Sequence, residues 1–165
     1  MNAPNGNGPA MDGPGSIDRR DYVTVRVGQQ MFGLPIDRVH DVFKVQAITA
    51  VPHAPAEIAG LLNLRGRVVT AICLRGRLGL SNPETSKLEI AVGIERWGEA
   101  YGLLVDSVGE VMALANDTFE PNPAHMDQRW AGLTRGVHRL DGELLVILDI
   151  DAVLSFQAAV DTRVA

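Results

Sequence analysis

The chain has 165 residues, of which 46% are hydrophobic and 21% are charged, and its formal charge is −5. These proportions are ordinary for a folded soluble protein, so they exclude wholesale disorder and residence in a membrane. The length allows one domain or two small domains that share an interface, and the acidic balance without a basic block argues against nucleic acid as a partner.

The sequence also predicts the cellular compartment. No stretch of about 18 apolar residues is present to span a bilayer, so direct membrane insertion is not expected. The first twenty residues lack the apolar core of a secretory signal, and Cys73 is the only cysteine, so it cannot form an internal disulfide. We therefore expect a cytoplasmic protein.

Regular structure is predicted to follow a glycine- and proline-rich start that has almost nothing apolar to bury, which is typical of a disordered tail. From Tyr22 onward, valines alternate with polar residues in the period-2 pattern of a half-buried strand. The first half of the chain is predicted to form strands at 22–27, 31–36, 39–45, 61–64 and 67–73. The second half is predicted to form strands at 88–95, 100–105, 108–114, 134–140 and 143–149.

Two sequence blocks recur in the same order in the two halves. GLPIDRVHDV at 33–42 is matched by GLLVDSVGEV at 102–111, and GLLNLRGRVVTAICLRGRL at 60–78 is matched by GVHRLDGELLVILDIDAVL at 136–154. The offsets are nearly equal, and glycines and aspartates match as well as aliphatic residues, which favours an internal duplication over chance. Five short strands in each copy are enough to close a small barrel and hide its edges.

Few helices are predicted. Residues 55–59 have a proline near the start and Gly60 as a stop, which indicates one helical turn. Asp149 is well placed to cap a second short helix, in which Ile150, Val153 and Leu154 follow helical spacing. In the first copy, Cys73 occupies the matching place and cannot cap comparably.

Two hairpin tips occupy matching positions in the copies but differ in charge. Arg65-Gly66 corresponds to Asp141-Gly142, and Asp-Gly is a turn dipeptide that needs positive φ. The glycine is explained by backbone geometry, whereas the charge reversal shows that the fold does not dictate the residue before it. Arg65 is therefore either a solvated turn residue or an anchor for a partner surface.

The candidates for catalysis and metal binding have simpler structural interpretations. Asp37 and Asp106 recur inside apolar segments, where we expect them to hydrogen-bond tight turns, because no histidine or serine recurs beside them for acid–base work. The four histidines lack metal-ligand spacing, and Cys73 is expected to be a packed small residue. No phosphate-binding or nucleophile motif is present, so we predict no catalytic residues, no metal and no cofactor.

The two tryptophans are predicted to be packed. Trp97 lies in the hairpin of residues 95–99, where it could be an exposed contact or a lid over the end of a barrel, and we favour the lid. Trp130 precedes the strand at 134 and is predicted to lie in the core.

Together, these features resemble those of the CheW family of chemotaxis coupling proteins, over about residues 22–156. The resemblance depends on the segment AEIAGLLNLRGRVVTAICLRGRLGL at 56–80 together with PHAPAEIAG, YGLLVDSVGEV and GVHRLDGELLVILDIDAVL. It implies a mainly β fold of two pseudo-repeated, five-stranded SH3-like barrels packed around a hydrophobic groove, with few short helices. The implied division is a disordered tail at 1–20, a CheW-like domain of two intertwined barrel subdomains at 21–156, and a C-terminal tail at 157–165.

The resemblance also implies a role. Such proteins are non-enzymatic adaptors that link the cytoplasmic hairpin tip of a chemoreceptor to the regulatory domain of a CheA-type histidine kinase, and they are recruited from the cytoplasm to membrane-bound receptor arrays. Carried over by position, the receptor- or array-binding residues are Val39, Asp41, Gly60 and Arg65. The family more often has glutamate at position 41 and aspartate at position 73, and Pro35 suggests an edge or irregular strand.

Other functions remain open at this point. A scaffold of a non-chemotactic signalling array would share every residue discussed above. An enzyme using Asp37 or Asp106 with a histidine brought close by folding is a more remote alternative, because the sequence offers no motif for one.

Overall fold

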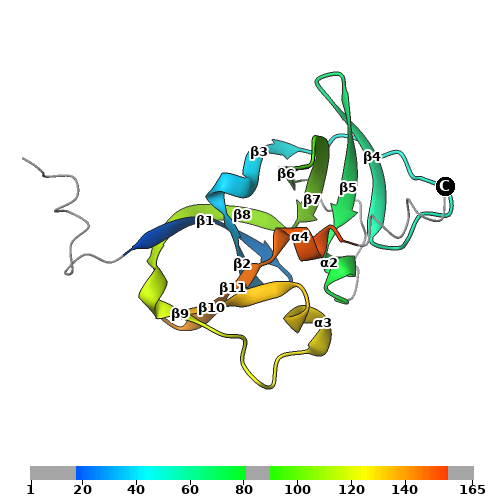
Figure 1. The fold of residues 1–165 in the computed structure, drawn as a ribbon. Coiled ribbons are helices and arrows are strands. Elements are labelled where there is room, and N and C mark those ends of the chain that lie inside the picture. Colours follow the sequence, from blue (N-terminus) through cyan, green and yellow to red (C-terminus); the bar gives the residue numbers. More distant parts are fainter. Residues whose placement is uncertain (1–17, 81–89, 156–165) are drawn as a thin grey trace, which may run out of the picture.

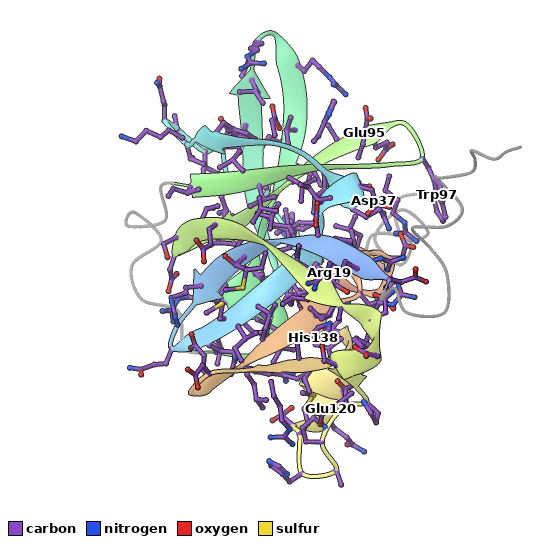
Figure 2. The ribbon with its side chains drawn as sticks, turned by 90° about the vertical axis from the view of Figure 1, so that its left-hand side faces the viewer. Arg19, Asp37, Glu95, Trp97, Glu120 and His138 are labelled. Carbon is purple, nitrogen blue, oxygen red and sulfur yellow. The ribbon has the colours of Figure 1, made fainter. Side chains whose placement is uncertain are left out.

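The structure is a computed structural model that describes residues 18–80 and 90–155. Within those ranges the fold is mainly β, as predicted, with two sheets and a few short helices (Figure 1). The predicted tails lie largely outside the described residues. In a view turned by 90° from that of Figure 1, the two sheets occupy separate halves of the molecule. Glu95 and Trp97 lie in one half, and Glu120 and His138 lie in the other (Figure 2).

One sheet has six strands in the order β8-β1-β2-β11-β10-β9, and the other has five in the order β3-β6-β7-β5-β4. The first half of the chain supplies β1 (Arg19–Val27), β2 (Gln30–Pro35), β3 (Val39–Lys44), β4 (Ile58–Leu64) and β5 (Arg67–Cys73). The second half supplies β6 (Ile90–Arg96), β7 (Glu99–Val105), β8 (Ser107–Ala115), β9 (Phe119–Glu120), β10 (Thr134–Leu140) and β11 (Glu143–Leu148). The ten predicted strands are thus confirmed within a few residues, and the two-residue β9 was not predicted.

The two copies of the repeat exchange strands. In the six-stranded sheet, β1 of the first copy pairs with β8 of the second, and β2 pairs with β11, to which it runs parallel. In the five-stranded sheet, β6 of the second copy pairs with β3 of the first, and β7 pairs with β5, to which it runs parallel. Neither sheet therefore belongs to one copy alone.

Buried apolar side chains fall into three clusters. The largest joins the two sheets, because residues such as Phe32 and Leu34 of β2 pack in the same cluster as Val92 of β6 and Leu103 of β7. A second cluster lies within the five-stranded sheet and contains Cys73, which is buried as predicted. A third lies within the six-stranded sheet. Because successive side chains of a strand point to opposite faces of its sheet, each face contributes to a different apolar cluster.

The short helical elements lie in the connections between strands or after β11. They are the 3-10 turns η2 (Ile36–Arg38) and η4 (Asn116–Thr118) and the helices α2 (Leu74–Arg77), α3 (Gln128–Ala131) and α4 (Ile150–Val153). At α4 the Asp149 carboxylate accepts a hydrogen bond from the Ala152 N–H at 3.1 Å, which confirms the predicted cap. At α2, Cys73 makes no side-chain cap bond, also as predicted.

The helical turn predicted at 55–59 is wrong. Pro55 accepts a turn bond from the Ile58 N–H at 3.0 Å, but Ile58 already begins β4 and pairs with Ile72 of β5. Pairing with a neighbouring strand outweighs the local proline and glycine signals there.

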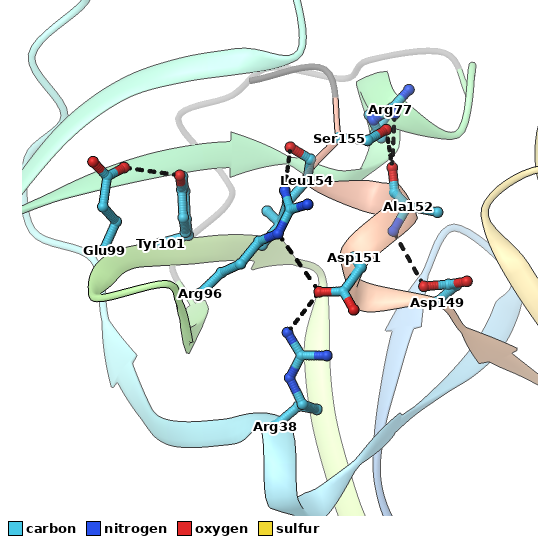
Figure 3. Close-up of polar contacts among 10 residues, drawn as sticks. All are labelled: Arg38, Arg77, Arg96, Glu99, Tyr101, Asp149, Asp151, Ala152, Leu154 and Ser155. Atoms are coloured by element: carbon cyan, nitrogen blue, oxygen red, sulfur yellow. Dashed lines mark hydrogen bonds and ion pairs between the residues drawn. The ribbon is translucent and has the colours of Figure 1, made fainter. Parts of the chain in front are cut away.

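Ion pairs and hydrogen bonds also link the two sheets. Asp151 of α4, which follows β11, accepts hydrogen bonds or ion pairs from Arg38 of η2 at 3.0 Å and from Arg96 of β6 at 3.6 Å (Figure 3). Arg77 of α2 donates to the backbone carbonyls of Ala152 and Val153 at 3.0 and 2.8 Å. Helix α4 of one sheet is therefore held by arginines that belong to the other sheet or to the connection between the sheets.

Candidate functional site

The tip at Arg65 is a tight two-residue turn between β4 and β5, and this hairpin projects from the molecule (Figure 1). Arg65 and Gly66 have φ angles of 54° and 84°, so both lie in the left-handed region, as a type I′ turn requires. The Asn63 side chain accepts a hydrogen bond from the Gly66 N–H at 3.1 Å. Arg65 is exposed, so the turn presents its guanidinium to solvent on a geometrically fixed base.

The equivalent tip of the other sheet has a different conformation. Gly142 has a φ of 87°, as predicted for the turn glycine, but Asp141 is not among the residues with positive φ. The positive φ predicted for the glycine is therefore confirmed at both tips, but only the Arg65 tip has two consecutive left-handed residues. Arg65 occupies a position where a side chain other than glycine, asparagine or aspartate costs about 1–2 kcal/mol, so the local backbone does not favour arginine.

A pocket of about 130 Å³ opens beside the Arg65 tip. Phe43, Val69 and Ile94 contribute apolar surface to it, whereas Asp41 and Arg65 contribute opposite charges. Its lining comes from all five strands of the sheet and the β4–β5 turn, and consists of His40, Asp41, Phe43, Leu64, Arg65, Arg67, Val69, Gly93, Ile94, Glu95, Ala100 and Tyr101. An apolar pocket edged by a few charged groups is typical of a recognition site for a protein side chain.

The Asp41 side chain fits in this pocket because the residue opposite it, Gly93, has no side chain. Asp41 of β3 pairs with Gly93 of β6, and a Cβ atom at Gly93 would collide with the Asp41 Oδ1 atom. The half-buried carboxylate therefore lies across the space that the glycine leaves open.

The other two predicted contact residues lie outside the pocket. Gly60 is buried in β4 with a φ of 149°, and a Cβ atom there would collide with the Thr49 carbonyl oxygen and come within 2.6 Å of Ile48. Val39 is partly buried against the cluster that joins the sheets. The structure thus brings Asp41 and Arg65 together, while Gly60 permits the close approach of residues 48 and 49 to β4.

Trp97 is the residue that sequence reasoning misplaced. Its side chain is 85% exposed at the tip of the β6–β7 hairpin (Figure 2), so it is not a lid. The Arg96 guanidinium lies 4.1 Å from the centre of the Trp97 ring. The signal that could have identified the exposed tip is the Trp-Gly dipeptide, because Trp97 and Gly98 have φ angles of 53° and 81°, the same turn as Arg65-Gly66. Trp130, by contrast, is partly buried against the shared cluster, and its indole N–H donates to the Leu78 carbonyl at 2.9 Å.

The two recurring aspartates do not form an acid–base site. The Asp106 carboxylate accepts hydrogen bonds from the Gly28 N–H at 2.8 Å and from Arg75 at 2.9 Å, so it supports a turn, as predicted, although the turn belongs to β1 and β2. Burial by itself raises the pKa of Asp106, but the Arg75 and Gly28 hydrogen bonds outweigh it and leave the pKa below its usual value. Asp37 is exposed in η2, and its side chain has no hydrogen bond to another described residue, so the turn bond predicted for it is wrong.

The remaining titratable groups give no metal site within residues 18–80 and 90–155, where no group of three or more histidine, cysteine or acidic side chains is placed to hold an ion. In the same ranges, no helix is long and apolar enough to cross a membrane.

Comparisons with known proteins agree with this geometry. The profile of the CheW-like domain family matches residues 21–158. The chemotaxis protein CheW of Bacillus subtilis is 30% identical over 137 residues, which are 83% of this chain and 88% of that protein. The probable chemotaxis protein CheW of Rhizobium etli is 27% identical over 136 residues, which are 82% and 88% of the two chains.

A solved structure shows the same fold. The scaffolding protein TtCheW from Thermoanaerobacter tengcongensis superposes with a TM-score of 0.71 at 30% sequence identity, over 80% of this chain and 90% of that chain. The family profile spans every described strand except the first two residues of β1. This chain therefore belongs to the family of CheW-like domains.

Proposed function

We propose that the chain is an adaptor that couples the cytoplasmic hairpin tip of a chemoreceptor to the regulatory domain of a CheA-type histidine kinase. The observation that carries this proposal is the family match over residues 21–158, which includes both sheets. Scaffolding proteins of the CheW family are non-enzymatic, and the paired, ionised Asp106 is consistent with that. The adaptor would act in the cytoplasm and be recruited to membrane-bound receptor arrays.

The receptor- or array-side contact is proposed to centre on the Arg65 pocket. Arg65 and Asp41 would meet the partner directly, because both line the pocket and the side chain of neither has a hydrogen bond or ion pair to another described residue. Val39 and Gly60 would act through shape, Val39 by its packing at the start of β3 and Gly60 by letting residues 48 and 49 lie against β4.

The physical basis is a pair of rigid surfaces. Strand-borne side chains and a fixed turn lose little conformational entropy when a partner binds, so a small pocket can contribute useful affinity. The apolar lining would supply most of the binding free energy, and the charges of Arg65 and Asp41 would fix orientation and suppress wrong partners.

The test is an NMR titration of the isotope-labelled chain, first with a receptor tip fragment and then with a kinase regulatory domain. We expect shifts near Asp41 and Arg65 with the receptor fragment and a separate set of shifts with the kinase domain. If neither partner produces shifts, while partners from another signalling array of the same genome do, the chemotactic assignment is wrong and the scaffold serves that other array.

A charge-reversal variant tests whether Arg65 itself contacts the receptor fragment. Arg65→Glu should weaken binding of the receptor fragment about tenfold or more, as expected for an interface anchor, and it should leave the thermal midpoint nearly unchanged, because neither side chain is favoured by the left-handed backbone. Asp141→Lys, a charge reversal at the equivalent tip of the six-stranded sheet, is the matched control and should leave binding of the receptor fragment unchanged. Equal losses of stability and binding in Arg65→Glu would contradict a contact role.

A further inference from the structure

A second pocket, of about 360 Å³, opens at the six-stranded sheet and shares no residue with the pocket beside Arg65. Tyr22 of β1 and Ile147 of β11 line it, and both also belong to the apolar cluster within that sheet. The cluster therefore reaches the surface at this pocket. Concave mouths of β-structures are common places for small ligands, and the volume lies within the range of about 300–1,000 Å³ that such sites have.

Among the described residues, two arginines and no acidic side chain line this pocket. Arg20 comes from β1 and Arg135 from β10, and both are exposed. The side chain of neither arginine makes a hydrogen bond or ion pair to another described residue. Asp21 and Asp117 are next in sequence to lining residues but do not line the pocket themselves. Two guanidinium groups at one concavity without a bound carboxylate favour an anion there.

The acidic group whose charge Arg135 influences is already bound by other arginines. Asp151 accepts a hydrogen bond from Arg38 at 3.0 Å and lies 3.6 Å from Arg96. The Arg38 hydrogen bond is the largest cause of the lowered pKa of Asp151, and the charge of Arg135 is a minor one. One carboxylate thus faces three guanidinium groups, so positive charge remains in excess beside the pocket.

Local structure brings one of the arginines and a hydroxyl group to this pocket. The register between β10 and β11 shifts between Thr134 and Gly136, so Arg135 is the extra residue of a β-bulge, a device that redirects a side chain. Tyr22 is only 3% exposed, yet its hydroxyl has no hydrogen bond to another described residue. That hydroxyl is not among the fully buried atoms without a partner, so the pocket that Tyr22 lines leaves it accessible.

The Phe119 ring gives the pocket a flat apolar wall and is 39% exposed. Its position is fixed by two neighbours. A Cβ atom at Gly136 would collide with the ring, and the His138 ring packs against it in a T-shaped arrangement with centroids 5.5 Å apart. A ring held in this way can stack on a flat ligand group with little loss of side-chain freedom.

We propose that this pocket binds a small molecule in which a phosphate monoester is joined to a flat apolar group. Guanidinium groups form charge-assisted, bidentate hydrogen bonds with phosphate oxygens, and two arginines match the charge of about −2 on a phosphate monoester better than the single charge of a carboxylate. The Tyr22 hydroxyl would donate a further hydrogen bond, and the Phe119 ring would stack on the flat group. This site goes beyond the adaptor function, because it requires neither receptor nor kinase.

The test is an NMR titration of the isotope-labelled full chain with phenyl phosphate, inorganic phosphate and benzyl alcohol, in about 0.15 M salt to screen non-specific attraction. Phenyl phosphate should cause saturable shifts at Asn116, Phe119 and Arg135. The other two probes each lack one half of the proposed chemistry and should bind about tenfold more weakly or less. The assigned ligand class is wrong if either of them binds as tightly as phenyl phosphate, and the site itself is wrong if no probe causes saturable shifts.

Variants test the individual groups. Arg135→Gln should weaken binding of phenyl phosphate about tenfold or more. Arg139→Gln is the matched control, because Arg139 lies on the same strand, pairs with Glu120 at 3.0 Å and does not line the pocket, so its loss should change binding less than about twofold. Tyr22→Phe should weaken binding about threefold or more and leave the thermal midpoint nearly unchanged, since the hydroxyl has no partner in the described fold. Equal losses in the two arginine variants would show general charge attraction and overturn the proposal.

Discussion

His138 shows how a single buried side chain couples stability to pH. Its imidazole is 1% exposed, lies between the rings of Tyr22 and Phe119, and shares a hydrogen bond of 3.1 Å with the Thr118 hydroxyl through Nδ1. Its Nε2 atom has no hydrogen-bond partner within the described residues. Burial lowers the pKa of His138, and the nearby Glu120 carboxylate only partly offsets this.

A pH dependence follows from that lowered pKa. In the unfolded chain His138 takes up a proton near pH 6.5, whereas in the fold it resists protonation. The free energy of unfolding should therefore be fully retained above about pH 6.5 and decrease as the pH falls below that value. Urea unfolding at pH 7.5 and pH 5 measures this decrease, and His138→Phe should reduce it. An equal decrease in the variant would show that other groups are responsible.

The Asp149 cap gives a second prediction at this scale. Asp149→Ala removes the acceptor for the Ala152 N–H and should cost about 1 kcal/mol of unfolding free energy. Asp149→Ser keeps an oxygen at the cap, so its unfolding free energy should fall by only about a few tenths of a kcal/mol. Thermal unfolding of both variants measures the difference, and equal losses would mean that the carboxylate acts through charge rather than as a cap.

At the scale of elements, the sequence predicted strands well because their apolar residues alternate, and it failed where pairing between distant strands decides. Ile58 looked helical beside Pro55, but its pairing with Ile72 makes it strand. The turns at Arg65 and Asp141 looked equivalent, yet only the former has two consecutive left-handed residues. Such differences depend on strand twist and partner strands, which a single sequence does not display.

Gly60 provides the test at this scale. Gly60→Ala should cost about 3 kcal/mol or more, because the added Cβ atom meets the Thr49 carbonyl and the φ of 149° is strained for any other residue. Gly66→Ala is the control, since nothing lies within 4 Å of its added Cβ atom and only a strain of about 1–2 kcal/mol is expected. Chemical denaturation compares them. A mild effect at Gly60 combined with lost partner binding would instead favour a direct contact role.

At the scale of the whole molecule, ion pairs and hydrogen bonds join the two sheets at two places. Arg75 of α2 and Asp106 after β7 connect the five-stranded sheet to Gly28 in the β1–β2 turn of the other. Asp151 makes the second connection through Arg38 and Arg96. The sequence indicated that Asp106 is structural, but its partner Arg75 could not be identified, because the contact depends on how the two sheets are stacked.

Removal of the Asp106 charge tests the first connection. Asp106→Asn should lower the free energy of unfolding by about 2 kcal/mol at pH 7, since it loses charge-assisted hydrogen bonds. Because the folded-state pKa of Asp106 is lowered, its contribution is present above about pH 4 and is lost as the pH falls further. The difference in unfolding free energy between the variant and the original chain should therefore become smaller in acid. A gap that does not change with pH would point to lost packing instead.

The exchange of strands between the copies also has a consequence for synthesis on the ribosome. β1 and β2 emerge first, but β2 must pair with β11, and Gln30 bonds to Leu144 across 114 residues of sequence. At a synthesis rate of about 5–20 residues per second, this delay is on the order of ten seconds. During this delay, one edge of β2 lacks its native partner, so the nascent chain is most vulnerable to aggregation before the residues of β11 have been made.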